Sequence, residues 1–283
     1  MRAVALPNEL PDFRPKPFLK WAGGKGKLVP QILDRFPEHF GRYHEPFLGG
    51  GAVFFALAPR KAVLSDVNGD LIATYCAIRD RVEQVMAKLR QHQPTEEHFY
   101  NVRALESGRL SPIEAAARTI FLNRTCFNGL YRVNRRGQFN VPFGRYTNPK
   151  ICNADNLRAV SEALQNVDIR SESVFDIGRR VRRGDLVYFD PPYDPVSRTA
   201  SFTSYARGGF GREEQERLAT LFGQLAERGV HVVLSNSDTP FIRELYRDFH
   251  IEQVFARRAI NSRGDRRGPV TEVLVSAGPV IRR

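Results

Sequence analysis

The sequence predicts an α/β protein with a mainly parallel sheet and a second unit inserted into the sheet domain. Short apolar segments alternate with amphipathic helical segments in both end regions of the chain, and such alternation is typical of a parallel sheet covered by helices on both faces. Between about residues 70 and 154 the alternation stops. We therefore expect an N-terminal arm at 1–17, a discontinuous sheet domain at 18–69 and 155–283, and an inserted domain at 70–154.

The N-terminal part of the chain predicts an arm followed by strand–turn–helix units. Residues 7–17 hold four prolines, which favour an extended arm. An apolar segment at 28–36 predicts a helix. Residues 42–58 predict a short strand, a glycine turn and a helix, and residues 61–66 predict a second strand that ends in an aspartate.

The inserted unit begins with helices and ends with irregular chain. Apolar residues recur at three- and four-residue spacing over residues 71–120, which predicts helices. One helix begins at Ser111, which is followed by proline and, three positions on, by glutamate. Residues 128–150 have no helical period and predict a β-hairpin with its turn at 135–137. A helical pattern returns at 153–165.

The C-terminal part returns to strands alternating with helices. Residues 185–190 predict a buried strand, residues 213–228 an amphipathic helix and residues 230–236 a second buried strand. The sequence Asp-Thr-Pro at 238–240 predicts the start of another helix. Two apolar segments around a basic loop at 261–268 predict a terminal hairpin.

Composition restricts the class of protein. The chain has 283 residues, of which 42% are hydrophobic and 26% charged, as in an ordinary globular protein with a real core. Its three cysteines are widely spaced and form no Cys/His cluster, so we expect neither disulfides nor a metal. The sequence has no apolar stretch of 18 residues and no signal-peptide core, so we expect a cytoplasmic protein without membrane segments. Nothing in the sequence indicates an obligate dimer, and we expect a monomer.

Most of the formal net charge of +12 lies in two segments. Residues 121–150 carry six basic and no acidic side chains, and residues 257–283 carry seven basic and two acidic ones, so their net charges of +6 and +5 make up 11 of the 12. The first segment interleaves its arginines with aromatic residues and asparagines, a mixture that contacts phosphates and stacks on bases. We therefore expect a nucleic-acid partner. A solvated surface is the alternative interpretation of either segment alone.

The first strand–glycine–helix unit predicts a site for an adenosine-containing ligand. The sequence Glu-Pro-Phe-Leu-Gly-Gly-Gly at 45–51 lies between a strand and a helix, where a ligand can approach the backbone and the helix N-terminus favours negative charge. Asp66 ends the next strand, where a carboxylate can accept both hydroxyls of a ribose. A glycine turn without a ligand and a helix cap are the alternative interpretations.

Asp190, Pro191, Pro192 and Tyr193 form the most specific short motif. They follow a predicted buried strand at its carboxyl end, where open α/β sheets place their chemistry. Asp190 and the carbonyl after it supply two acceptors, and Tyr193 supplies a flat surface. This set suits a planar base with an exocyclic amine, because two acceptors can localise the lone pair on its nitrogen. A rigid turn without a chemical role is the alternative interpretation.

Six segments resemble, in the same order, the Dam-type DNA adenine-N6 methyltransferases. They are FLKWAGGK, EPFLGGGAVF, LSDVN, the run at 123–146, DPPY and FTSY, and together they reach from about Phe18 to Val275. The run at 123–146 is the most specific, because it matches the DNA-reading segment of that family. The resemblance implies a Rossmann-like, S-adenosylmethionine-dependent methyltransferase sheet, and it implies that the insertion at 70–154 is a DNA target-recognition domain.

The resemblance implies S-adenosylmethionine as the methyl donor. The positions that match cofactor-binding residues are Trp21, Lys25, Phe47, Gly49, Gly51, Asp66, Asp176 and Asp190. Trp21 would lie beside the methionine part, Asp66 would hold the ribose and Asp176 would lie near the adenine. Without the motif, Trp21 would be interpreted as a core anchor and Asp176 as a helix cap.

The resemblance also implies contacts to double-stranded DNA. The positions that match base-contacting residues for the palindrome GATC are Lys20, Leu130, Arg132, Pro142 and Tyr146, and those that match phosphate contacts are Arg124, Asn134, Asn140 and Arg145. Arg132 is a natural bidentate partner for guanine. Phe127 and Asn128 match the positions that insert an aromatic ring into the base stack and contact the space left by a flipped base. Asn128 and Asn134 have the alternative role of shaping turns.

The mechanism implied is direct methyl transfer to a flipped adenine, without a covalent intermediate or a metal. The base would lie against Tyr193, with its amine held by Asp190 and the Pro191 carbonyl, and residues 202–205 would order over the site. A cytosine-N4 methyltransferase more often begins the tetrad with serine, and RNA or protein methyltransferases typically begin it with asparagine. A catalytically silent DNA-binding protein would have no use for Asp190 and Asp66.

Overall fold

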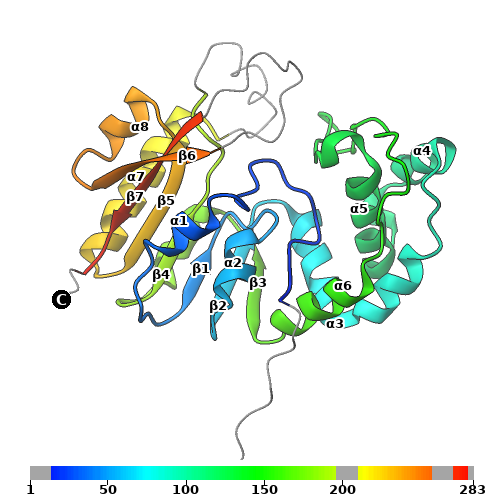
Figure 1. Ribbon diagram of the computed structural model, residues 1–283, viewed down its shortest axis with the longest axis horizontal. Helices are drawn as coiled ribbons and strands as arrows, with labels where there is room; N and C mark the ends of the chain where they lie inside the picture. The colour runs from blue at the N-terminus through cyan, green and yellow to red at the C-terminus, as the bar shows by residue number, and fades with distance from the viewer. Residues whose placement is uncertain (1–13, 196–209, 257–269, 280–283) are drawn as a thin grey trace, which may run out of the picture.

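A computed structural model describes residues 14–195, 210–256 and 270–279, and its centre is a seven-stranded sheet (Figure 1). The strand order is β3-β2-β1-β4-β5-β7-β6. The strands are β1 (Tyr43–Glu45), β2 (Ala62–Asp66), β3 (Val167–Ser171), β4 (Leu186–Phe189), β5 (His231–Ser237), β6 (His250–Ala256) and β7 (Val270–Ala277). Neighbouring strands from β3 to β5 pair in parallel, whereas β7 is antiparallel to both β5 and β6. The predicted Rossmann-like sheet is confirmed.

Strands such as β4, β5 and β7 divide their side chains between two hydrophobic clusters, one on each face of the sheet. In β4, Leu186 and Tyr188 belong to one cluster, and Val187 and Phe189 belong to the other. The first cluster includes buried residues of α1 (Val29–Leu33), α2 (Ala52–Leu57) and α3 (Gly69–Leu89). The second includes buried residues of α7 (Arg212–Glu227) and α8 (Pro240–Leu245). Helices therefore cover both faces, as the continuous apolar run of β4 predicts.

A helical unit lies between β2 and β3. It contains α3, α4 (Glu96–Ala104), the short turn η1 (Ser107–Arg109), α5 (Pro112–Thr125) and, after an irregular segment, α6 (Ala154–Ala163). Figure 1 shows α4 and α5 on the side of the molecule away from β5, β6 and β7. Buried residues of α3 and α5 belong to the same hydrophobic cluster as the sheet. The boundaries of a separate recognition domain at 70–154 therefore stay a prediction.

The predicted start of α5 is confirmed. Ser111 Oγ accepts a hydrogen bond from the Glu114 N–H over 3.3 Å, and the Glu114 carboxylate accepts one from the Ser111 N–H over 3.2 Å. This reciprocal capping box satisfies two backbone donors at the helix N-terminus. The predicted hairpin after α5 is also present, with an antiparallel bridge between Val133 and Phe139.

Two elements differ from the sequence-based expectation. The apolar pattern does not indicate β3, because only Val167 and Ile169 of its five residues are apolar and the strand lies at the edge of the sheet. The helix expected at 28–36 is shorter, since α1 ends at Leu33. Pro37 disfavours a helical conformation at the residue before it.

Three predicted features lie outside the described residues. They are most of the arm at 1–17, the segment at 202–205 and the basic loop at 261–268. Across the ranges that the structure describes, no helix is both long and apolar enough to span a membrane.

Candidate active site

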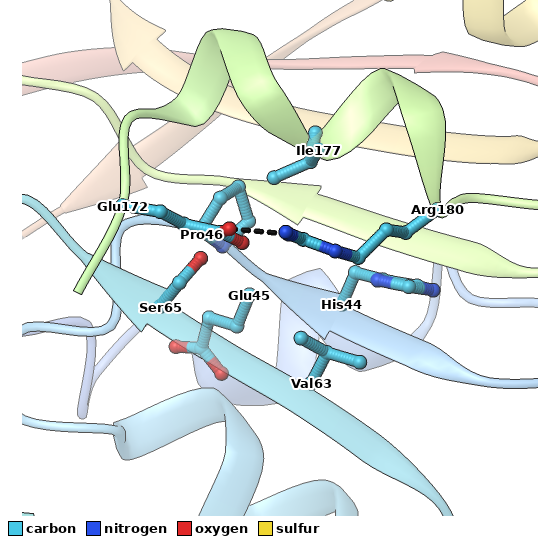
Figure 2. A pocket seen from close by; sticks show the side chains of 8 residues that line it. All are labelled: His44, Glu45, Pro46, Val63, Ser65, Glu172, Ile177 and Arg180. Atoms are coloured by element: carbon cyan, nitrogen blue, oxygen red, sulfur yellow. Dashed lines mark hydrogen bonds and ion pairs between the residues drawn. The ribbon is translucent and has the colours of Figure 1, made fainter. Parts of the chain in front are cut away.

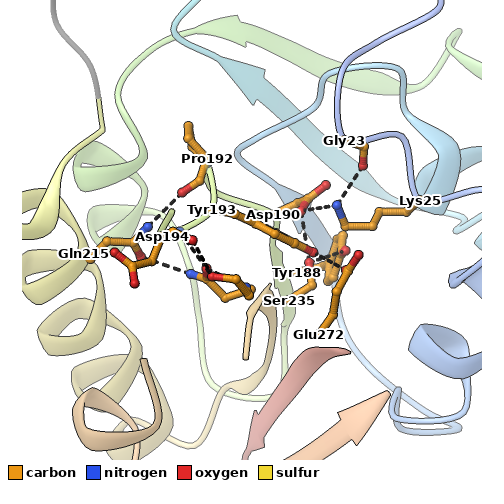
Figure 3. A network of polar contacts seen from close by, with 12 residues as sticks. Gly23, Lys25, Tyr188, Asp190, Pro192, Tyr193, Asp194, Gln215, Ser235 and Glu272 are labelled. Carbon is orange, nitrogen blue, oxygen red and sulfur yellow. Dashed lines mark hydrogen bonds and ion pairs between the residues drawn. The ribbon is translucent and has the colours of Figure 1, made fainter. Parts of the chain in front are cut away.

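Asp190 directly follows β4, at the carboxyl edge of the sheet where the strand order reverses between β1 and β4. Figure 3 shows its carboxylate within a polar network. Lys25 Nζ lies 2.8 Å from Asp190 Oδ1, and the Ser235 hydroxyl of β5 donates to the same oxygen over 3.0 Å. Asp190 Oδ2 accepts no hydrogen bond from any described residue. One oxygen of the carboxylate is therefore fixed by the protein and the other is available.

Burial and hydrogen bonding act on Asp190 in opposite directions. Burial raises the pKa of its carboxyl, whereas Lys25 and Ser235 lower it by favouring the ionised form. Lys25 is itself only 6% exposed and also donates to the Gly23 carbonyl over 2.7 Å. The structure thus places Lys25, predicted as a cofactor residue, as the ionic partner of the tetrad carboxylate.

The Tyr193 ring is held from two sides. Its hydroxyl donates to Glu272 of β7 over 2.7 Å, and Lys25 Nζ lies 4.5 Å from the ring centroid. These contacts come from distant parts of the chain, and Figure 3 shows them converging beside Asp190. The orientation of the ring is therefore set by the folded chain.

The two prolines of the tetrad differ in their partners. The Pro192 carbonyl accepts a hydrogen bond from Gln215 Nε2 of α7 over 2.8 Å. Gln215 is buried, and its own carbonyl oxygen accepts from Asn236 of β5 over 3.1 Å. The Pro191 carbonyl accepts no hydrogen bond in the described part of the chain. Pro191 O and Asp190 Oδ2 are therefore two available acceptors on consecutive residues.

A second buried acid, Glu45, ends β1 next to this edge of the sheet. Burial, helped by the nearby Asp190 charge, raises the pKa of its carboxyl to about 8. The Tyr43 hydroxyl donates to Glu45 Oε2 over 2.8 Å, which opposes the shift. Glu45 therefore differs from Asp190, which has a lysine to balance its charge.

The glycine turn between β1 and α2 brings three predicted cofactor residues together. The Gly49 N–H donates to Asp66 Oδ2 over 3.1 Å, and the Asn68 N–H donates to Asp66 Oδ1 over 2.9 Å. Gly49 has a φ of +47°, and a Cβ on it would lie 2.8 Å from Trp21 Cδ1. The Trp21 indole therefore packs directly on the turn, and only glycine leaves room for it. Gly51 is the N-cap of α2.

Phe47 and Asp176 lie in a different environment. The Phe47 ring packs edge-to-face on Phe210 with centroids 5.4 Å apart, and Phe175 stacks on Phe210 at 6.3 Å. Asp176 lies in the 3₁₀ turn η3 (Val174–Arg179), is exposed, and makes no side-chain hydrogen bond to a described residue. The N-cap of η3 is Ser173, so the helix-cap interpretation of Asp176 is wrong. Its cofactor role stays a prediction.

Several predicted DNA residues gather around the turn η2 (Phe127–Gly129). Lys20 Nζ lies 4.4 Å over the Tyr146 ring, and the Lys20 side chain packs against Gly129. Phe127 is 51% exposed, which is unusual for a large apolar side chain in a folded protein. Asn128 has a φ of +56°, so it shapes the turn whether or not it also contacts DNA.

The predicted base contact Arg132 and the predicted phosphate contact Asn140 bind each other. Arg132 Nε donates to Asn140 Oδ1 over 2.7 Å across the hairpin. Asn134 Oδ1 accepts from the N–H groups of Arg136 and Gln138 over 2.9 and 3.0 Å. Asn134 therefore shapes the hairpin turn, as its alternative interpretation predicts.

The remaining predicted DNA residues differ in exposure. Arg124 Nε is buried and has no hydrogen-bond partner among the described residues, and burial lowers the pKa of its guanidinium. An unpaired buried donor is costly, so this position favours an acceptor from outside the chain. Pro142 and Arg145 are exposed, and Leu130 is half-buried.

A crevice between η3 and the strands β1 and β2 is separate from the tetrad (Figure 2). It is lined by His44, Glu45, Pro46, Val63, Ser65, Glu172, Ile177 and Arg180, of which Arg180 pairs with Glu172. It has no room for a water-sized molecule and is therefore not a ligand site. Among the residues that the structure describes, no group of three or more His, Cys, Asp or Glu side chains could hold a metal ion.

Comparison with known proteins assigns the family. The sequence model of the D12 class N6 adenine-specific DNA methyltransferases matches residues 21–260. The chain belongs to this family. It is 45% identical to the Type II methyltransferase M1.LlaDCHI of Lactococcus lactis subsp. cremoris, over 92% of this chain and 95% of the relative. It is 40% identical to the Type II methyltransferase M.MjaIII of Methanocaldococcus jannaschii (89% and 95%) and 38% identical to the DNA adenine methylase of Escherichia coli strain K12 (93% and 96%).

As a D12-class enzyme, the chain is an adenine-specific DNA methyltransferase with DNA as its substrate. The family match contains the tetrad, the glycine turn and the run at 123–146. Ser235 and Glu272 are partners of the tetrad that the sequence motifs do not indicate. Ser235 could have been found from sequence, because it is a polar residue within the apolar run of β5. No local pattern indicates Glu272, because β7 comes close to the site only through its place in the sheet.

Proposed function

We propose that the chain transfers the methyl group of S-adenosylmethionine to N6 of an adenine that is flipped out of duplex DNA at the sequence GATC. The observation that carries the proposal is the pair of available acceptors, Asp190 Oδ2 and Pro191 O, next to the fixed ring of Tyr193. An exocyclic amine has two N–H donors attached to a planar ring. Two acceptors and one aromatic face match those three features.

These residues activate the amine by position. When Asp190 Oδ2 and Pro191 O each accept one N–H, the lone pair of N6 is directed away from both, and its delocalisation into the ring decreases. The groups are already in place before the base arrives, which is how positioned acceptors lower a barrier. Asp190 can take the proton that N6 loses, because burial raises the pKa of its carboxyl.

The residues around the glycine turn fit S-adenosylmethionine, which supplies an electrophilic methyl group when bound. A carboxylate has about four acceptor positions, and the two N–H groups on Asp66 leave others for ribose hydroxyls. Trp21 would lie against the methionine part, and Phe47 and Asp176 would lie towards the adenine. Val67, which follows Asp66 and is 81% exposed, adds an apolar surface at the same place.

DNA recognition is proposed for the surface around η2 and the hairpin. The exposed Phe127 ring can enter the base stack when the adenine leaves it. Lys20 and Arg132 would read base edges, and Arg124 and Arg145 would contact phosphates. The sequence GATC is proposed from the resemblance of the run at 123–146 to the DNA-reading segment of Dam-type enzymes.

Replacement of Asp190 tests the function. Asp190→Asn keeps the shape of the side chain but turns one acceptor into a donor, and we expect methyl transfer to fall by about 10²–10³-fold or more while the duplex still binds. The matched control is Asp168→Asn, a half-exposed acid of β3 that pairs with Arg170, and its activity should be unchanged. Near-normal turnover by Asp190→Asn would contradict the mechanism.

The product identifies the reaction. Labelled S-adenosylmethionine is incubated with duplexes that contain or lack GATC, and the DNA is digested to nucleosides. We expect label in N6-methyladenine from the GATC duplex alone. Label in cytosine would support the cytosine-N4 alternative, label in both duplexes would exclude GATC as the recognised sequence, and binding without label would support a silent DNA-binding protein.

A further inference from the structure

The segment at 16–21 runs between the sheet and the helical unit, as the dark-blue chain in Figure 1 shows. Two buried asparagines bind its backbone in the same way. Asn156 of α6 accepts from the Lys16 N–H and donates to the Lys16 carbonyl, both over 2.9 Å. Asn123 of α5 accepts from the Lys20 N–H over 2.8 Å and donates to the Lys20 carbonyl over 2.7 Å. Each amide therefore takes the place of a neighbouring strand.

Asn123 makes one contact that Asn156 lacks. Its Nδ2 also donates to the carbonyl of Gly129, over 3.0 Å. Gly129 is the last residue of η2, the turn that carries the exposed Phe127. Asn123 is 1% exposed and Asn156 is 4% exposed, so both amides are fixed in the interior. Of these two amides, Asn123 alone also contacts the predicted DNA-reading turn.

This single amide sets the place of the Lys20 side chain. The Lys20 stem lies so close to Gly129 that a Cβ there would be 2.6 Å from Lys20 Cβ, and Lys20 Nζ lies 4.4 Å over the Tyr146 ring. A lysine side chain has four rotatable bonds, so its backbone anchor and the surfaces beside it decide where its ammonium lies. Both the anchor and the Gly129 surface depend on Asn123.

The same amide lies one residue from the proposed cofactor surface. Trp21 follows Lys20 and stacks on Tyr131, with centroids 5.1 Å apart and an angle of 25° between the rings. Tyr131 lies two residues after Gly129, and Trp21 also packs on Gly49. The position of η2 is therefore linked to the glycine turn through the backbone that Asn123 holds.

We propose that Asn123 is a positioning residue for DNA sequence discrimination. It holds the Lys20 backbone and the η2 turn at a fixed separation, so that the Lys20 ammonium meets one base edge and not its neighbours. A recognition group must be held to within about half an ångström by the residues behind it. This inference rests on the proposed function, because it assigns Lys20 to a base contact.

Two variants of Asn123 and two of Asn156 test the inference. Asn123→Asp keeps the acceptor for the Lys20 N–H and loses both donors, and Asn123→Ala loses all three hydrogen bonds. Asn156→Asp and Asn156→Ala are the matched controls, because they remove the same kind of backbone contact without touching η2. The measurement is the ratio of kcat/KM for methyl transfer to a GATC duplex and to duplexes with one base pair of the site changed. Since both values scale with the same concentration of folded enzyme, partial unfolding leaves the ratio unchanged.

We expect the ratio to fall by about tenfold or more in both Asn123 variants, as for loss of a good base contact. The Asn156 variants should keep the wild-type ratio, even if their thermal unfolding midpoint falls by as much as that of the Asn123 variants. In a Lys20→Ala background, Asn123→Ala should produce no further loss, because the two residues act through one contact. For inactive variants, the ratio of the equilibrium binding constants for the GATC duplex and the altered duplex replaces the ratio of kcat/KM values.

Wild-type ratios in both Asn123 variants would overturn the inference and leave adenine methylation intact. An equal loss in the Asn123 and Asn156 variants would also overturn it, because the effect would then be general loosening of the segment. Failure of the wild-type chain to methylate adenine would instead overturn the proposed function, and the binding ratios would still decide the role of Asn123.

Discussion

Asp190 and Glu45 show how partners decide the charge of a buried acid. Both lie at the carboxyl edge of the sheet, and burial raises the pKa of both. Asp190 has the Lys25 ammonium at 2.8 Å, which favours its ionised form. Glu45 has the hydroxyl of Tyr43, and its pKa is about 8. Glu45 is therefore largely protonated at neutral pH, so that of these two acids Asp190 is the one that favours a negative charge.

The raised pKa of Glu45 predicts that stability falls as the pH rises from 4.5 to about 8. The ordinary value is 4.5 and the folded value is about 8, so the folded chain binds more protons than the unfolded chain between them. The stabilisation that comes from proton binding by folded Glu45 is fully present below its ordinary pKa of 4.5 and is lost as the pH rises through about 8. Between those two pH values the free energy of unfolding of the wild type should fall by on the order of a few kcal/mol relative to that of Glu45→Gln, because the glutamine amide does not ionise. Urea unfolding of both proteins at several pH values measures the difference, and parallel pH profiles would contradict a raised pKa.

The residues found from sequence are those whose signal is local. Asp190, Asp66 and the glycines stand beside recognisable strands, so their place at the carboxyl edge followed from the order of elements. Ser235 reaches the tetrad through the pairing of β5 with β4, and Glu272 reaches it through the position of β7 between β5 and β6. Asn123 begins the run at 123–146, but its proposed role depends on contacts with the backbone of Lys20 and Gly129, which no local pattern indicates.

At the scale of elements, α5 connects a helix cap to the turn η2. It begins at the Ser111 capping box and ends one residue before Cys126, after which η2 starts. Near its last turn it carries Asn123 and the unpaired Arg124. The stability of this helix therefore bears on the proposed DNA surface, although its first turn is far along the helix from it.

Removal of the cap predicts a stability effect without an effect on chemistry. Ser111→Ala removes the hydroxyl that accepts from the Glu114 N–H, and we expect the free energy of unfolding to fall by about 1 kcal/mol. Ser111→Thr keeps the hydroxyl and serves as the control. Urea unfolding gives the stability, and kcat at saturating DNA should be equal in all three proteins. A large loss of kcat in folded Ser111→Ala would mean that the cap acts on the site directly.

The elements differ in how well the sequence indicated them. The parallel strands β1, β2, β4 and β5 and the helices that follow them have clear apolar periods, and all were predicted within a few residues. The edge strand β3 was not, because Asp168 and Arg170 interrupt its apolar residues. The glycine turn predicts the hairpin, which is held by the Val133–Phe139 bridge, the Arg132–Asn140 contact and the hydrogen bonds of Asn134 within the turn.

At the scale of the whole molecule, the fold brings a strongly basic segment next to the candidate active site. The insertion between β2 and β3 contains the segment at 121–150, whose net charge is +6. That segment folds next to the carboxyl edge of the sheet, since Asn123 and Tyr131 contact the chain at Lys20 and Trp21. A nucleic acid bound along it would therefore reach the tetrad.

This arrangement predicts that DNA binding weakens steeply with salt and that the basic residues at 121–150 cause part of this dependence. The logarithm of the duplex binding constant should fall linearly with the logarithm of salt concentration, with a slope of about −0.9 for each phosphate contacted. Arg145→Gln removes an exposed cation from the segment at 121–150 and should make the slope less steep by about 0.9, with equal weakening for GATC and non-GATC duplexes. Arg109→Gln is the matched control, because Arg109 is 82% exposed in η1 and pairs with Glu106, outside the segment. Fluorescence anisotropy at several salt concentrations measures all three proteins. If Arg145→Gln left the slope at the wild-type value, the charge of this segment would be a solubilising surface and the DNA would lie elsewhere.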